Sequence, residues 1–142
     1  MRRGPGVAVV RRLLAIAAVA VLSLTLAAGA QAADPVKTKI ELELLLPSAG
    51  KVFAVGTLSA ADKRCIPGRM VEIYLSGDEG PVYIDTARTA DRGGWLGFRK
   101  ATDLPKQQYT EIRLVALKST VKVSKNKKIT CGGKTRTYPL AG

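Results

Sequence analysis

Apolar and polar residues alternate along residues 37–47 with a period of two. The segment KTKIELELLLP separates into two sets, an apolar one with Ile40, Leu42, Leu44 and Leu46 and a polar one with Lys39, Glu41 and Glu43. Successive side chains of a strand point to opposite faces, whereas a helix would scatter the apolar set around its axis. The pattern therefore predicts a half-buried strand, which Pro47 and Gly50 end.

Strand-like segments separated by turns continue to the end of the chain. They lie at residues 51–60, 69–77, 81–90, 95–101 and 109–118, and residues 119–140 read as a hairpin with a basic tip followed by a last strand. Gly56, in the middle of one segment, indicates a bulge or a close approach of another part of the chain. About seven or eight short strands at a spacing of roughly 8–12 residues predict an all-β fold, an antiparallel sandwich.

Residues 1–32 have the pattern of a signal peptide. An arginine-rich start is followed by an apolar stretch at 13–28 and by a small-x-small cleavage site, Ala30-Gln31-Ala32. The apolar stretch is shorter than the about 20 residues of a membrane span, which disfavours the alternative of an uncleaved anchor. Cleavage after Ala32 leaves residues 33–142 as a single domain in the periplasm or outside the cell. We expect the chain to contact a membrane only through the signal peptide, before cleavage.

The charge of the chain is strongly positive and unevenly placed. Removing the signal peptide takes away four arginines and lowers the formal net charge from +12 to +8. No acidic residue follows Glu111. The basic residues from position 118 onward are Lys118, Lys122, Lys125, Lys127, Lys128, Lys134 and Arg136.

This C-terminal basic set has two interpretations. Lysines on a sheet edge prevent pairing with other sheets, whereas a basic patch can bind anionic polymers such as polysaccharide, lipid head groups or nucleic acid outside the cell. Tyr138 is the only aromatic residue in this part of the chain, so stacking on single-stranded nucleic acid is not supported. We expect the partner to be an envelope protein or an anionic polymer, with no specific recognition of nucleic acid.

The sequence contains no histidine, which limits the chemistry it can perform. Its absence removes the usual general base, the Ser-His and Cys-His pairs and the commonest ligand of transition metals. We therefore expect no catalytic residue, no metal and no cofactor. The enzymatic alternative is a hydrolase with paired carboxylates, although aspartates at turns usually bond the local backbone. Its candidate acids are Asp78, Glu79, Asp85, Asp91 and Asp103.

The chain has two cysteines, Cys65 and Cys131. An oxidising compartment favours a disulfide between them, which would close a loop of about 66 residues. Two free buried thiols and an intermolecular bridge are the alternatives. Trp95, which follows the turn DRGG, is expected in the core of the sandwich, and stacking on a sugar is its alternative role.

Several short motifs resemble those of secreted bacterial β-sandwiches of the transthyretin-like or carboxypeptidase-regulatory-like kind. The resemblance rests on FAVGTLSAADKRCIPGRMVEIYLSGDEG, on TARTADRGGW and on the late Cys131. The motif positions are Cys65, Arg69, Val71, Thr89, Gly93 or Gly94, and Trp95. The resemblance implies an Ig-like or transthyretin-like sandwich and a non-enzymatic accessory, adhesion or envelope role. Transthyretin-related hydrolases use histidines, which this chain lacks.

The sequence thus predicts an exported, non-catalytic β-sandwich that binds a partner or has a structural role at the cell envelope, stabilised by one disulfide. The alternative function is a polyanion-binding module that uses the basic C-terminal hairpin.

Overall fold

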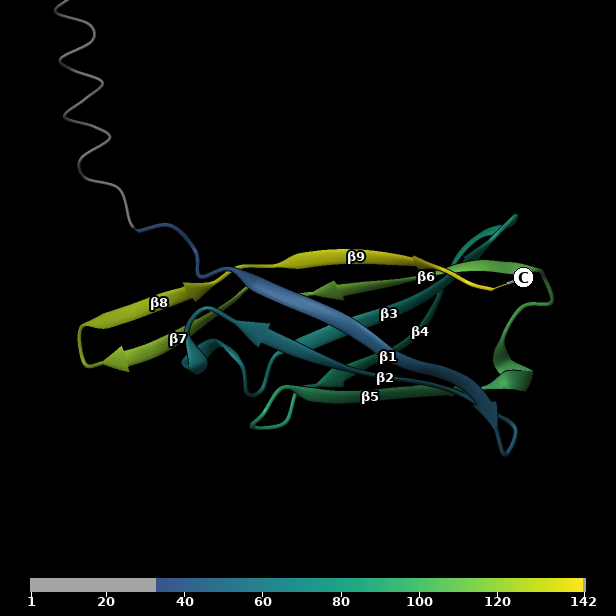
Figure 1. Cartoon of the computed structure of the whole chain (residues 1–142), viewed down its shortest axis with the longest axis horizontal. Coiled ribbons are helices and arrows are strands. Elements are labelled where there is room, and N and C mark those ends of the chain that lie inside the picture. Colours follow the sequence, from purple (N-terminus) through teal and green to yellow (C-terminus); the bar gives the residue numbers. More distant parts are fainter. Residues whose placement is uncertain (1–32, 142) are drawn as a thin grey trace, which may run out of the picture. The chain divides into compact units, whose positions relative to one another are not determined.

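A computed structural model describes residues 33–141 of the chain (Figure 1). The predicted signal peptide, residues 1–32, lies outside the described residues. Pro35–Gly142 forms one compact unit. Among residues 33–141 there is no helix that is long and apolar enough to cross a membrane.

The described part of the chain consists of nine strands and two short 3-10 helices. The strands are β1 (Thr38–Ser48), β2 (Lys51–Ala60), β3 (Met70–Gly77), β4 (Gly80–Arg88), β5 (Gly94–Lys100), β6 (Tyr109–Ala116), β7 (Ser119–Ser124), β8 (Lys127–Cys131) and β9 (Lys134–Pro139). The 3-10 helices are η1 (Lys63–Cys65) and η2 (Ala101–Asp103). The expected all-β class is confirmed. The nine strands correspond to the six separate segments, the hairpin and the last strand that the sequence predicts, so the estimate of about seven or eight strands is slightly low.

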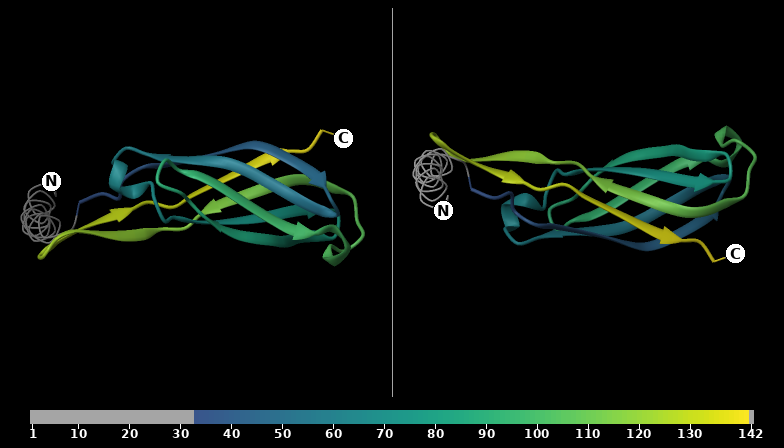
Figure 2. Two further views of the ribbon diagram at one scale, coloured as in Figure 1. Left: turned by 90° about the horizontal axis from the view of Figure 1, so that it is seen from below. Right: turned by 90° about the horizontal axis from the view of Figure 1, so that it is seen from above.

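The strands form two antiparallel sheets that face each other, as Figures 1 and 2 show. One sheet has the order β1-β2-β5 and the other the order β4-β3-β6-β9. Strands β7 and β8 pair with each other and with none of the other described strands, and they form a hairpin at one end of the sandwich (Figure 1).

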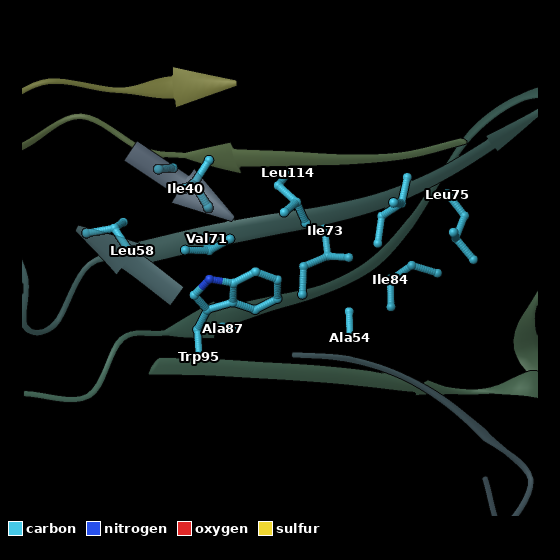
Figure 3. Packing of buried hydrophobic residues seen from close by; sticks show 12 residues of the cluster. Ile40, Ala54, Leu58, Val71, Ile73, Leu75, Ile84, Ala87, Trp95 and Leu114 are labelled. Atoms are coloured by element: carbon cyan, nitrogen blue, oxygen red, sulfur yellow. The ribbon is translucent and has the colours of Figure 1, made fainter. Parts of the chain in front are cut away.

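The hydrophobic core lies between the two sheets (Figure 3). Its residues are Ile40, Ala54, Leu58, Val71, Ile73, Leu75, Ile84, Ala87, Trp95, Ile112, Leu114 and Ala116. All of them belong to Pro35–Gly142, and because a domain with its own hydrophobic core folds as a unit, we expect this part of the chain to fold by itself. Trp95 is 3% exposed, which confirms its expected place in the core.

A β-bulge changes the predicted faces of β1. The register pairs Leu42 with Gly56 and Leu44 with Val55, so Glu43 is an extra residue in β1. One extra residue exchanges the two faces of the strand beyond it. The prediction is therefore correct for Ile40 and wrong for Leu44, which is 51% exposed, and Leu45 packs against the core instead.

Gly56 of β2 lies opposite β1 just before the bulge and leaves room for close packing there. A Cβ atom at this position would overlap the carbonyl oxygen of Glu41 and the indole ring of Trp95. The absence of a side chain lets β1 and the tryptophan approach the backbone of β2 closely. Of the two alternatives predicted for Gly56, the close approach is the correct one, whereas the extra residue of the bulge lies in the partner strand β1.

We predict that Gly56→Ala lowers the free energy of unfolding by about 1–3 kcal/mol, because the added methyl group overpacks the interior. Gly94→Ala is the matched control in the neighbouring part of the sheet, since a Cβ atom there meets nothing within 4 Å. Urea unfolding followed by Trp95 fluorescence measures both variants. Equal stabilities of the two variants would contradict the close packing at Gly56.

Candidate functional site

A disulfide joins Cys65 at the end of η1 to Cys131 at the end of β8, with a Cα–Cα distance of 5.5 Å. Both cysteines are fully buried. The pairing expected from the sequence is confirmed, and neither free thiols nor an intermolecular bridge applies. The segment before β1 is hydrogen-bonded to the same end of β8. Val36 N donates to Thr130 O, and Gly132 N donates to Val36 O, both at 2.8 Å.

Arg69 lies beside the disulfide and is 1% exposed. Its Nη1 atom donates to Cys65 O at 2.8 Å and to Thr38 Oγ1 at 3.2 Å. Its Nη2 atom donates to Leu117 O at 2.9 Å and to Gly132 O at 2.8 Å. Burial without a carboxylate partner lowers the pKa of the Arg69 guanidinium.

The guanidinium of Arg69 therefore holds four segments of the chain together. Its acceptors come from η1, the start of β1, the link between β6 and β7, and the link between β8 and β9. Buried backbone carbonyls need hydrogen-bond donors, and the planar fork of an arginine supplies several of them at once. We assign Arg69 a structural role.

Thr89 completes this arrangement and is also buried. Its Oγ1 atom accepts a hydrogen bond from Arg69 N at 2.7 Å and donates one to Ile66 O at 2.6 Å. The motif positions Cys65, Arg69 and Thr89 thus lie together at one end of the sandwich. Their contacts are all with other parts of the fold, which identifies this part of the motif as structural.

Three adjoining hollows lie along the edges of the sandwich near this network. Their volumes are about 540, 490 and 370 Å³. They follow β1 and β9, which are edge strands of different sheets and contact each other. The hydroxyl of Tyr138 accepts a hydrogen bond from Leu42 N at 3.2 Å and thereby links the two edges.

The residues that line these hollows include five basic side chains and no acidic one. The basic residues are Lys37, Lys39, Lys118, Lys134 and Arg136, and we call them the groove cluster. Lys134 lines all three hollows. The carboxylate of Glu41 lies 4.0 Å from the Arg136 guanidinium, but both groups are half exposed, so water screens this pair strongly.

The structure divides the seven basic residues that the sequence singled out into two groups. Lys118, Lys134 and Arg136 belong to the groove cluster, together with the unexpected Lys37 and Lys39. The other four lie on the β7–β8 hairpin: Lys122, Lys125, Lys127 and Lys128. All four of these lysines are exposed.

The lysines of the hairpin include a pair of like charges. Lys122 and Lys128 are direct partners across β7 and β8. Like charges in this position destabilise a strand pair, so these lysines do not stabilise the hairpin through their charges. Protection of an exposed edge and attraction of an anion are both compatible with their placement.

The acidic candidates for catalysis lie apart on different elements. Asp78 and Glu79 form the turn between β3 and β4, Asp91 lies in the turn before β5, and Asp103 lies in η2. Asp85 of β4 accepts hydrogen bonds from Thr86 N at 2.8 Å and Phe98 N at 3.0 Å. None of these acids lines the three hollows, and residues 33–141 contain no group of acids or cysteines that could hold a metal ion.

Comparisons with protein-family models, with curated proteins and with solved structures find no match to this chain. The resemblance to transthyretin-like modules therefore stays a prediction from the motifs.

Proposed function

We propose that this chain is an exported, non-catalytic binding module whose ligand is an anionic polymer, such as a polysaccharide or the charged surface of a lipid layer. The observation that carries the proposal is the groove cluster: its five basic side chains line adjoining hollows without an acidic residue among the lining. A long polyanion could follow these hollows along β1 and β9 while its charges meet successive lysines.

Export and a non-catalytic role are parts of the same proposal. The disulfide supports an oxidising compartment, the periplasm or the outside of the cell. The lack of histidine and the separation of the acidic residues favour binding over catalysis. The buried contacts of Arg69 and Thr89 give the transthyretin-like motif a structural purpose, as expected of such an accessory module.

Retention on immobilised heparin tests the proposal, and the salt dependence of retention counts the charges involved. We predict that Lys39→Gln with Lys134→Gln reduces the slope of log affinity against log salt by roughly two, because two ionic contacts are lost. The matched control, Lys63→Gln with Lys106→Gln, removes the same charge from exposed positions outside the groove cluster and should change the slope little.

Two further outcomes decide between the basic surfaces. A larger loss for Lys125→Gln, Lys127→Gln and Lys128→Gln than for the groove variant would place the binding on the β7–β8 hairpin. Equal losses for the groove variant and its control would mean that only net charge matters. No retention of the unchanged protein at low salt would show that the proposed function is wrong.

A further inference from the structure

The outer face of the three-stranded sheet carries two apolar rows that the core does not use. The register pairs Leu44 with Val55 and Val55 with Leu96, which forms the first row. It pairs Leu46 with Phe53 and Phe53 with Phe98, which forms the second row. Because each strand contributes residues two positions apart, all of them lie on the same face. We call Leu44, Leu46, Phe53, Val55, Leu96 and Phe98 the outer apolar face.

This face is open to solvent. Leu44 is 51% exposed, Leu96 52% and Phe98 42%, and the other three residues are partly exposed. The rings of Phe53 and Phe98 lie 5.5 Å apart, and Lys51 Nζ lies 4.7 Å from the centre of the Phe98 ring. Contiguous apolar side chains on a protein surface mark interaction sites.

The bulge in β1 is what creates the outer apolar face. The extra residue Glu43 shifts the alternation, so Leu44 and Leu46 point outward while Leu45 packs inward. Without the bulge, the regular alternation that begins at Ile40 would direct Leu44 and Leu46 into the core. A bulge that turns two leucines toward water is understandable if another surface covers them.

The charges at the two ends of the outer apolar face identify its partner. At one end β1 presents the exposed Glu41 and Glu43 together with Lys39, so this end has a net negative charge, and at the other end Lys51 and Lys100 pair across β2 and β5. When a second copy is placed on this face with its strands antiparallel, the negative end of each copy meets the positive end of the other. We propose that a second copy of this chain packs on the outer apolar face.

The symmetry of such a dimer follows from the charges. A two-fold axis in the plane between the sheets and perpendicular to the strands places the strands of the two copies antiparallel. The row with Leu44 then packs on the partner's row with Phe98, as in a sheet-on-sheet sandwich. The acidic end of each copy lies over the lysine end of the other, which favours this orientation over the parallel one.

The size of the face predicts a weak dimer. Three strands spaced about 4.8 Å apart and about seven residues long give a face of about 14 by 23 Å. This is small beside the about 800 Å² per partner of a standard interface. We therefore expect a weak dimer that forms only at high protein concentration.

Sedimentation velocity over a concentration series tests the proposal with the disulfide-bonded domain that begins at Ala33. We expect a reversible monomer–dimer equilibrium, and we expect Leu96→Lys to abolish the dimer. Tyr83→Lys is the matched control, because Tyr83 is 45% exposed on β4, in the other sheet. It should dimerise as the unchanged protein does, and thermal unfolding checks that both variants are folded.

A charge exchange tests the antiparallel orientation separately. Glu43→Lys alone and Lys51→Glu alone should each weaken the dimer severalfold, and the two changes combined should restore it.

A protein that stays monomeric at its highest soluble concentration, or a Leu96→Lys variant that still dimerises, would overturn the proposal. Binding of the monomer to neutral phosphatidylcholine vesicles through Leu96 would also overturn it, in favour of a lipid surface. Failure of the charge exchange to restore the dimer would rule out the proposed orientation.

Discussion

Replacing Arg69 by alanine should lower the free energy of unfolding by about 4 kcal/mol. The change removes the donor to three backbone carbonyls, those of Cys65, Leu117 and Gly132. Each buried acceptor that loses its partner costs about 1–3 kcal/mol, and the cavity left by the side chain adds to the loss. Urea unfolding of the disulfide-bonded protein measures the difference.

Two further substitutions at this position separate hydrogen bonding from packing. Arg69→Met keeps an unbranched side chain that partly fills the space but provides no donor, so it should recover only a small part of the stability. Arg69→Lys keeps the charge but replaces the planar fork by a single ammonium group, so it should fall between the other two. If Arg69→Met were as stable as the unchanged protein, the carbonyl network would not contribute to stability.

Arg113→Met is the control for removal of an arginine. The Arg113 guanidinium lies 4.9 Å from the centre of the Tyr74 ring on the outer side of β6 and β3. Tyr74 and Arg113 are both partly exposed, and a contact of this kind contributes about 0.5–2 kcal/mol, more where water is excluded. The control should therefore lose much less stability than any variant of Arg69.

The sequence predicts strands well where the alternation depends on local residues. In β3 the apolar set Val71, Ile73 and Leu75 is buried as the pattern indicates. In β1 the same reasoning fails after Leu42, because the position of a bulge depends on the partner strand and on Trp95, which lies far along the chain. Gly56 indicates that a bulge or a close approach occurs at this place in the sheet, but a glycine alone does not show which strand contains the extra residue.

The candidate site could be predicted only in part for the same reason. The charge run identifies Lys118, Lys134 and Arg136, because they are close in sequence. Lys37 and Lys39 join them only because β1 and β9, at opposite ends of the domain sequence, become neighbouring edges. The pattern of residues 37–47 does place Lys39 on the polar side of its strand, but nothing in it shows which other strand lies beside that face.

The role of Arg69 shows a further limit of sequence reasoning. The motif places an arginine four residues after Cys65, but its acceptors lie 31, 4, 48 and 63 residues away along the chain. An arginine at the start of a strand is usually expected in solvent. Only the folded arrangement reveals that several carbonyls converge on its side chain.

Removing the disulfide with Cys65→Ala and Cys131→Ala should cost a comparable amount, about 4 kcal/mol. The bond joins residues 66 positions apart, and closing a loop of this size in the unfolded chain accounts for the estimate. A domain of this kind is stable by about 5–15 kcal/mol, so the variant should unfold at much lower urea concentration. The unchanged protein measured with a reductant is the control and should lose a similar amount.

The disulfide and Arg69 should be energetically coupled. Arg69 binds the carbonyl of Cys65, which is a disulfide cysteine, and the carbonyl of Gly132, which directly follows the other disulfide cysteine. Without the bond these carbonyls are held less firmly, so the arginine has less structure to stabilise. The triple variant should therefore lose less stability than the sum of the two separate losses, as residues that share partners do. A double-mutant cycle from urea unfolding measures the coupling. Strict additivity would show that Arg69 stabilises the end of the sandwich independently of the disulfide.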